Sequence, residues 1–519
     1  MISTIAQGHA PSAETNLKSR MLIALLFSTI FVAGSFIWQG RDGFNMGDEG
    51  FLWYGVQRVL AGEVPLLDFM SYDPGRYYWS AALMRLMHDD GIMAMRGAAA
   101  VFQLLGVFVG LLLLLRPKSR LDVPLLTLAA VTLTVWMYNW FKVYDSALCL
   151  ILIGILTFLV EQPSNKRFFL SGVTVGLVAV FGRNHGMYGV AGVLGVVIYF
   201  ACRHRSLKGL ISGLFCFGSG IFIGYLPILI MIVAVPGFAA AFWESIRFIT
   251  DRGATNLTLP VPWPWLVLVG RVRPSEILIG LLFVAILAFG VLSLLWVIRQ
   301  AVLRKPVAPQ FVAASMLALP YTHYAFSRAE LFHLALAIFP MLIGIFILVE
   351  DLPQRRRWAA AVMGVSLIVA LPNNTGWNCL VLERCVTMQV GGNTLRVQPL
   401  IAGFITMLTS VTERYAPDGR NYLVTPLWPA AYTLFNRKSP MWDSHALFPR
   451  DKQNELKEIE RIKAADPGFV MILDQAVDGR DDLRFRNTHP LIEQYVRDNF
   501  DPITIENFPP PTFQFYKSR

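Results

Sequence analysis

Four groups of polar side chains lie beside apolar segments, where a charged group costs several kcal/mol unless it is solvated or paired. The groups are, in chain order: Asp42, Asp48, Glu49, Asp68, Asp73 and Arg76; Lys142, Tyr144 and Asp145; Arg183, Asn184, His185 and Tyr188; and His323, Arg328, Glu330 and His333. Arginine binds phosphate through paired hydrogen bonds, and a carboxylate can take the proton from an attacking hydroxyl. Together these residue types predict a reaction on a lipid-linked phosphate.

Each group also has a structural interpretation. Asp48 and Glu49 can serve as the N-cap and first-turn acid of a helix that begins near Gly50. We favour a chemical role for this pair, because capping requires only one acid. Asp73 precedes Pro74 and Gly75, a sequence typical of a turn. Arg183 and Arg328 can anchor lipid headgroups, and His185 and His333 can be hydrogen-bonded inside a helix bundle.

The composition indicates the class of protein that positions these residues. Of 519 residues, 55% are hydrophobic and 15% are charged, and the mean hydropathy is +0.50. These values exclude a disordered chain, a disulfide-rich secreted module and an ordinary cytosolic enzyme, and they predict an integral membrane protein. The net charge of +10 does not indicate a nucleic-acid partner, because basic residues collect on cytoplasmic loops.

Apolar segments predict an α-helical multi-pass membrane domain over residues 1–372 with about eleven spans. The predicted spans are 21–39, 97–115, 121–138, 146–160, 168–182, 186–202, 209–235, 276–298, 308–325, 331–349 and 358–372. One alternate set of loops carries 16 basic and five acidic residues, which places those loops in the cytoplasm. The prediction is therefore a bacterial inner-membrane protein with a cytoplasmic N-terminus and an extracytoplasmic, periplasmic C-terminal domain.

Two predicted outer loops, 40–96 and 236–275, are long and mix charges with aromatic residues. Within them, 49–61 and 238–248 have the apolar spacing of helices that lie in the membrane interface. The Pro/Trp-rich segment 260–265 predicts a position at headgroup depth. Because the four polar groups all fall on this outer side, they can converge on one cavity.

Residues 373–519 carry 17 basic and 17 acidic residues and predict a soluble α/β domain. The predicted strands are 384–390, 421–425, 468–474 and 502–506, and the predicted helices are 397–414, 426–435, 450–465 and 489–499. The prolines at 509–511 predict an extended tail. Cys379 and Cys385 can form a disulfide in an oxidising compartment, although spacing alone does not settle the pairing.

The first outer loop resembles that of GT-C fold glycosyltransferases, in the bacterial branch similar to protein O-mannosyltransferases and the aminoarabinose lipid A transferase. The resemblance rests on Gly47-Asp48-Glu49-Gly50, Tyr54-Gly55, Gly62-Glu63-Val64-Pro65 and Asp68-Phe69. The turns Arg183–Tyr188 and Ser327–His333 are also similar to turns of that branch. No β-trefoil domain is inserted between spans, which disfavours a protein acceptor.

The resemblance implies that Asp48 is the catalytic base and that Glu49 is the second member of an acid pair. It also implies a polyprenyl-phosphate sugar donor, inversion at the anomeric carbon, and a donor phosphate held by Arg76, Arg183 or Arg328. Asp68, Asp145, His185 and His333 are further cavity candidates. Asp48 and Asp145 could hold a divalent cation, but we predict no metal and no cofactor.

Other functions share parts of this pattern. A transporter or flippase of a lipid-linked glycan intermediate would carry ionisable groups at mid-span and inverted repeats, which the sequence does not show clearly. An O-antigen ligase or polymerase-like enzyme would use the same donor class without the acid pair. The acceptor can be a glycan, a lipid or a protein, and no P-loop or dinucleotide fingerprint indicates a nucleotide donor.

Overall fold

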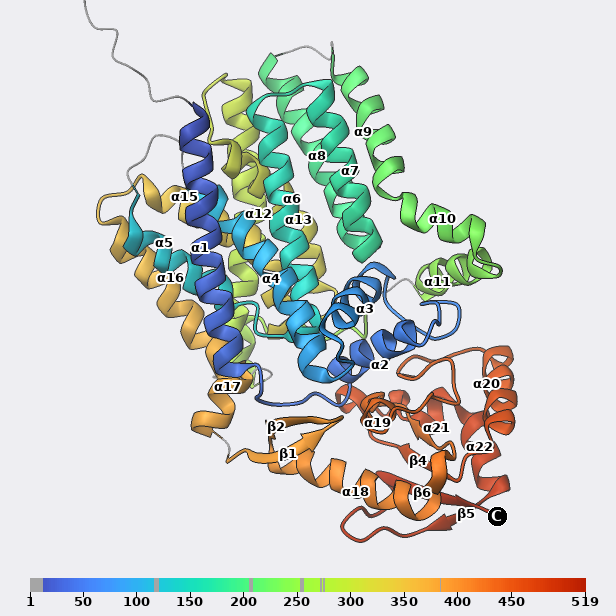
Figure 1. The fold of residues 1–519 in the computed structure, drawn as a ribbon. Coiled ribbons are helices and arrows are strands. Elements are labelled where there is room, and N and C mark those ends of the chain that lie inside the picture. The colour runs from blue at the N-terminus through green and yellow to red at the C-terminus, as the bar shows by residue number, and fades with distance from the viewer. Residues whose placement is uncertain are drawn as a thin grey trace, which may run out of the picture.

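The computed structural model describes residues 13–115, 121–204, 209–252, 256–270, 273, 276–382 and 384–519. Arg116, Lys118, Arg120, Arg205 and Lys208, which contribute to the predicted orientation, lie outside the described residues. The chain forms a helix bundle with a small α/β domain at one end (Figure 1). Helix α1 begins at the opposite end of the bundle, so the start of α1 and the C-terminal domain lie at the two ends of the molecule.

All eleven predicted spans fall on helices. The bundle contains α1 (Ala13–Gln39), α4 (Ile92–Leu114), α5 (Val123–Val135), α6 (Val143–Glu161), α7 (Asn165–Phe181), α8 (Arg183–His204), α9 (Leu210–Gly224), α10 (Leu226–Ala234), α12 (Ile277–Val302), α13 (Pro309–Phe326), α14 (Leu331–Ala337), α15 (Phe339–Glu350) and α16 (Arg355–Ala370). By length and composition, five described helices can cross a membrane, or up to eight spans if each bent pair counts once. The count of eleven stays a prediction, because helices such as α5 fall short of the ~20 residues of a full span.

Glycines at four-residue spacing bring α7 and α9 into backbone contact. A Cβ on Gly172 or Gly176 of α7 would collide with carbonyl groups of α9. A Cβ on Gly220 or Gly224 would collide with carbonyl groups of α7 in the same way. Small residues allow this close approach where lipid tails provide no hydrophobic drive for helix association. Helix α9 is followed by α10, whose axis is bent by 52° from that of α9.

The first outer loop folds into α2 (Asp48–Leu60) and α3 (Gly75–Met87). The predicted helix at 49–61 exists, but it does not lie in the membrane interface, because α2 is buried from Glu49 to Val59. Its outer side packs against the C-terminal domain, where Gly50 lies against Ala430 so closely that a Cβ would clash. The polar residues Gln57 and Arg58 are buried as well, since the tertiary packing covers the side predicted to face water.

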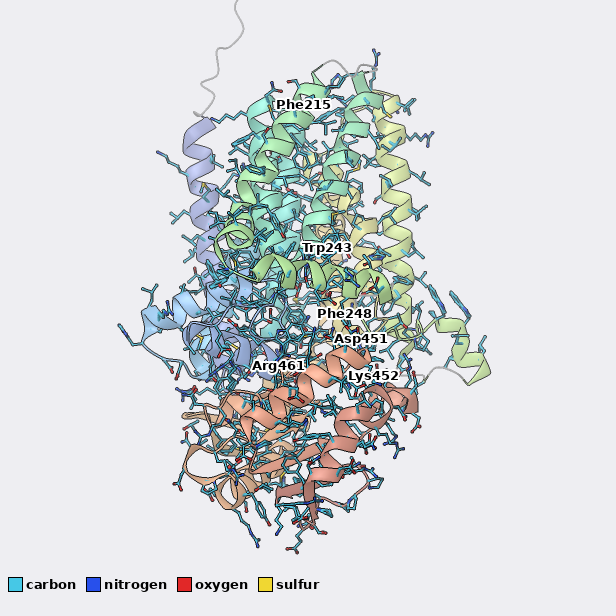
Figure 2. The ribbon with its side chains drawn as sticks, turned by 90° about the vertical axis from the view of Figure 1, so that its right-hand side faces the viewer. Phe215, Trp243, Phe248, Asp451, Lys452 and Arg461 are labelled. Atoms are coloured by element: carbon cyan, nitrogen blue, oxygen red, sulfur yellow. A yellow bond between two sulfur atoms is a disulfide. The ribbon has the colours of Figure 1, made fainter. Side chains whose placement is uncertain are left out.

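The second outer loop contains α11 (Phe238–Arg252) and a 3-10 helix at Pro264–Val269, and its predicted helix at 238–248 is confirmed. Trp243 is 61% exposed, as expected of a residue at a membrane interface. Figure 2 shows α11 lying across the junction between the bundle and the C-terminal domain. Phe248 of α11 lies beside the start of α20 (Lys452–Ala465), where the Arg450 guanidinium stacks 3.7 Å from the Phe248 ring centroid.

The C-terminal domain contains a hairpin and a four-stranded sheet. The hairpin pairs β1 (Val386–Val390) with β2 (Asn393–Val397), and the sheet has the order β3-β4-β6-β5. The sheet strands are β3 (Leu423–Thr425), β4 (Phe469–Leu473), β5 (Phe500–Ile503) and β6 (Phe513–Ser518). The main helices are α18 (Pro399–Tyr415), α19 (Ala430–Leu434), α20 (Lys452–Ala465) and α22 (Pro490–Asn499). The predicted α/β class is therefore confirmed.

Three details of this domain differ from the sequence-based expectation. Strand β2 was not predicted, although Gly391-Gly392 between β1 and β2 is a typical hairpin turn. Strand β6 follows the prolines at 509–511, so the tail returns to the sheet and pairs with β4. Strand β5 lies at Phe500–Ile503, slightly before the predicted range.

Cys379 and Cys385 form a disulfide with their Cα atoms 5.1 Å apart.

One hydrophobic core joins the C-terminal domain to the membrane domain. The same core cluster contains Trp53 and Tyr54 of α2 together with Tyr432 of α19 and Phe469 of β4. An ion pair of 2.6 Å between Arg396 and the buried Asp42 also connects the hairpin to the first outer loop. The predicted division at residue 372 stays a prediction, but the two parts meet through a packed interface.

Candidate active site

A cavity of about 1210 Å³ lies where the bundle, the first outer loop and the C-terminal domain meet. Its charged and polar lining comes from all three: Asn45, Asp48, Glu49, Tyr72, Arg96, Asn139, Lys142, Arg328, Glu330, His333, Arg384, Gln398, His445 and Gln475. Aromatic residues such as Trp140, Phe141 and Trp428 fill the gaps between them. Such a mixture of an apolar wall and a few polar groups is typical of a small-molecule or lipid-headgroup site.

Asp48 lies at the first turn of α2 and faces this cavity. The Asn45 side chain caps the helix, because its Oδ1 accepts hydrogen bonds from the backbone N–H groups of Gly47 and Asp48. In the described part of the chain, no group hydrogen-bonds to the Asp48 carboxylate, which is half-buried. The helix N-terminus favours its negative charge. The Asp48 carboxylate is therefore available to a ligand that enters the cavity.

Glu49 also lines the cavity, but its carboxylate is fully engaged by Arg96. The Arg96 guanidinium donates to both Glu49 oxygens, at 2.7 and 2.9 Å, and both residues are at most 2% exposed. Arg96 also donates to the carbonyls of Gly40 and Gly43. This arrangement fixes the loop that carries Asp48. The predicted catalytic role of Glu49 stays a prediction, and its geometry is that of a structural ion pair.

Lys142 provides a cation in the cavity beside the start of α6. Its Nζ lies 4.2 Å from the ring centroid of Tyr72, which lines the same cavity. Among the described residues, the Lys142 ammonium forms no ion pair with a carboxylate. An unpaired ammonium next to an aromatic ring is suited to bind an anion such as a phosphate.

Arg328 lines the cavity and is held by two acids. Its guanidinium donates twice to Asp478 of the C-terminal domain, both at 2.7 Å, and once to Glu330 at 2.6 Å. The hydrogen bonds that Arg328 donates to the Asp478 carboxylate raise the pKa of Arg328. Burial alone would raise the pKa of Glu330, but His333 and Arg328 hold it below its ordinary value. His333 Nδ1 lies 3.1 Å from Glu330, so the predicted candidate His333 belongs to this cluster.

Arg76, Asp145 and His185 meet one another but not the cavity. Asp145 Oδ1 accepts from His185 Nε2 at 2.7 Å and from the Arg76 guanidinium at 3.4 Å. All three are at most 4% exposed, and His185 Nδ1 lies 2.8 Å from the Tyr321 hydroxyl. The contact of Arg76 with a donor phosphate stays a prediction. Here the structure shows a buried network inside the bundle.

Arg183 and Asp68 lie outside the cavity lining as well. The Arg183 side chain pairs with Asp73 at 2.6 Å and donates to Ser245 of α11 at 2.9 Å. Asp68 accepts the backbone N–H of Val64 at 2.7 Å, which closes a turn. Their predicted roles at the site stay predictions. The contacts of Arg183 connect the start of α8 with α11 and with the turn before α3.

The structure adds His445 to the cavity, a residue that no sequence pattern singled out. His445 lies in a loop of the C-terminal domain almost 400 residues after Asp48. A lone histidine in a loop carries no spacing signal, so only the tertiary structure brings it to the site. Among the described residues, no group of three or more His, Cys, Asp or Glu side chains is arranged to hold a metal ion.

No protein-family model matches the chain, and no curated protein matches it. Among solved structures, the oligosaccharyltransferase of Archaeoglobus fulgidus in the apo form has a TM-score of 0.50 and 10% identity, covering 94% of this chain and 73% of its own. ArnT from Cupriavidus metallidurans bound to undecaprenyl phosphate has a TM-score of 0.49 and 12% identity, covering 95% and 97%. The likeness to the oligosaccharyltransferase shows the fold.

The chain is therefore an α-helical multi-pass membrane protein of the GT-C fold, with a C-terminal α/β domain. The solved structure with a TM-score of 0.50 is an oligosaccharyltransferase, and its likeness at 10% identity concerns the fold. Its activity does not follow from the fold alone, because one fold can host different functions. The function has to be argued from the cavity.

Proposed function

We propose that this protein is an inverting glycosyltransferase that moves a sugar from a polyprenyl-phosphate donor to a hydroxyl acceptor at the outer face of the cytoplasmic membrane. One observation carries the proposal: Asp48 and Lys142 line the same cavity at the bundle end, and no described residue hydrogen-bonds to the Asp48 carboxylate or forms an ion pair with the Lys142 ammonium. A base for the acceptor and a cation for the leaving phosphate are the two groups that this reaction requires.

The proposed reaction has a defined flow of atoms. The acceptor oxygen attacks the anomeric carbon while Asp48 takes its proton, and the bond from that carbon to the phosphate oxygen breaks. Attack on the face opposite the leaving phosphate inverts the anomeric centre. Lys142 and Arg328 stabilise the departing phosphate, whose charge grows as the bond breaks. The fixed position of Asp48 follows from the Glu49–Arg96 pair behind it.

The experiment uses the full chain in lipid nanodiscs with a panel of synthetic undecaprenyl-phosphate hexoses and pentoses. Cell-envelope glycolipid fractions serve as acceptors, and mass spectrometry follows the release of undecaprenyl phosphate. We expect the wild type to consume at least one donor and Asp48→Asn to stop the release. Asp498→Asn, an exposed acid on α22, is the matched control and should stay active.

Three results would contradict the proposal. The wild type could consume no donor in the panel, or Asp48→Asn could retain full activity. The third is movement of intact donor across a vesicle bilayer without release of undecaprenyl phosphate, which would identify a transporter instead.

A further inference from the structure

The loop between α19 and α20 is long and irregular, and its central part is buried. It runs from Phe435 to Asp451 without helix or strand, yet Ser439, Asp443 and Ser444 are at most 4% exposed. Most loops lie on the surface, and a buried irregular loop needs specific hydrogen bonds for its backbone. This segment, which we call the junction loop, therefore has a position set by its contacts.

Hydrogen bonds connect the junction loop to the first outer loop. The Tyr54 hydroxyl of α2 accepts the backbone N–H of Ser439 at 3.1 Å. The Trp442 carbonyl accepts the backbone N–H of Met70 at 2.9 Å, and the Trp442 indole donates to the Leu67 carbonyl at 3.2 Å. These contacts fix the junction loop against the segment that carries Asp48.

His445 is the junction-loop side chain that reaches the start of α2. Its ring centroid lies 5.6 Å from that of Phe51, and its Nε2 lies 3.9 Å from the position that a Cβ on Gly47 would occupy. It lines the cavity together with Asp48. In the described part of the chain, neither ring nitrogen of His445 has a hydrogen-bond partner. A ring nitrogen of His445 that can accept a proton therefore lies close to Gly47, the residue directly before Asp48.

The charges around His445 keep its imidazole basic but neutral. Burial lowers the pKa of His445, the charges of Asp48 and Asp443 raise it, and Lys142 lowers it. Arg450 pairs with Asp443 at 3.1 Å, so this second acid is partly neutralised. At neutral pH the ring is therefore an acceptor of protons, and Asp48 is the acid whose charge raises its pKa most.

We propose that His445 is the proton relay that restores Asp48 after each transfer. This inference rests on the proposed function. The acceptor hydroxyl gives its proton to the Asp48 carboxylate as the sugar is transferred and the polyprenyl phosphate leaves. The neutral Asp48 carboxyl then gives this proton to His445 Nε2, and the resulting imidazolium releases it to water. His445 acts through Asp48, so the first transfer needs Asp48 alone and every later one needs both residues.

The kinetic test compares the first and later turnovers of the full chain with the active donor of the panel. For His445→Gln we expect one equivalent of undecaprenyl phosphate to be released at the wild-type rate. Steady-state turnover should then fall about 10- to 100-fold, somewhat below the typical range for loss of an acid–base group. His445→Asn should behave in the same way, and His204→Gln, an exposed histidine at the end of α8, is the matched control.

A second measurement needs no activity. The rate at which diethyl pyrocarbonate modifies His445 in the nanodisc-embedded protein, followed by peptide mass spectrometry across pH, gives the midpoint of its titration. In Asp48→Asn this midpoint should shift downward, because the charge that favours the imidazolium is lost. Asp498→Asn should leave the midpoint unchanged.

The outcomes separate the relay from the proposed function. Unchanged steady-state turnover in both His445 variants, with an active wild type, would overturn the relay and leave the glycosyltransferase intact. A first turnover slowed as much as the later ones would also overturn it, since His445 would then act in the transfer itself. An unshifted midpoint in Asp48→Asn would show that Asp48 does not influence the titration of His445, and it would overturn the relay. A wild type without any donor turnover contradicts the proposed function, and the relay with it.

Discussion

Two clusters of charged residues lie close together in this protein but differ in their partners. The cavity cluster includes Asp48 and Lys142, which form no ion pair with any residue that the structure describes. The bundle cluster joins Arg76, Asp145 and His185 in a network that is at most 4% exposed. A buried ion pair is poor evidence for function, since its charges already neutralise each other. An unpaired charge facing a cavity is better evidence, because a ligand can complete it.

The same contrast exists between adjacent residues of one helix. Asp48 and Glu49 are successive acids at the start of α2, yet one faces the cavity freely and the other binds Arg96 at 2.7 Å. Successive residues of a helix point in directions about 100° apart, so neighbours in sequence meet different surroundings. Matched substitutions at these two positions test the comparison most directly.

The largest expected effect is that of Asp48→Asn on activity. Loss of the base should lower the transfer rate about 10²- to 10⁴-fold, and the melting temperature should stay within one or two degrees, since the carboxylate has no partner to lose. Donor turnover and thermal unfolding of the same nanodisc sample measure the two quantities. A much lower melting temperature for Asp48→Asn would show that Asp48, like Glu49, stabilises the fold.

Glu49→Gln should show the opposite pattern. It leaves the Arg96 guanidinium buried without a counter-charge, which typically destabilises a protein by about 3–5 kcal/mol. We expect a clear loss of thermal stability, and any folded fraction should keep a working Asp48. If folded Glu49→Gln loses as much activity per molecule as Asp48→Asn, the acid pair acts together in catalysis.

Lys142→Met and Arg76→Met form a second matched pair. Loss of Lys142 removes one charge-assisted contact to the donor phosphate, worth about 1.5–3 kcal/mol, so the KM for donor should rise about 10- to 100-fold with stability unchanged. Loss of Arg76 should lower stability, because Asp145 remains buried with one cation fewer. An increase in the KM for donor in Arg76→Met at normal stability would support the predicted contact of Arg76 with the donor phosphate.

Asp478→Asn should have the smallest effect. Its bidentate contact with Arg328 weakens when the carboxylate becomes an amide, which costs about 1 kcal/mol or less at this partly exposed position. The released Arg328 is then more available to phosphate, so the KM for donor should fall a few-fold. Donor titration of the variant and of Asp498→Asn checks this, and a raised KM would show that Asp478 positions Arg328 for the donor.

The class of the molecule and most of its helices could be predicted from the sequence. Twenty-residue apolar segments can satisfy their backbone in lipid only as helices or closed barrels, so hydropathy alone located every predicted span on a helix. In the C-terminal domain, the local pattern of short apolar runs was enough to locate β1, β3 and β4. It was not enough for β6, whose place depends on pairing with β4 some 40 residues away.

Which charged residues have partners depends on the tertiary structure. The types and spacing of Asp48, Glu49, Arg76, Arg183 and Arg328 are equally suggestive in the sequence. In the fold, the last four pair with Arg96, Asp145, Asp73 and Asp478 of other elements, whereas no described residue pairs with Asp48. His445 reaches the cavity because the junction loop is hydrogen-bonded to the first outer loop, far away in the chain. Hydropathy is a local property of the chain and can be read from its sequence. The pairing of charges depends on distances across the fold, and these exist only once the chain has folded.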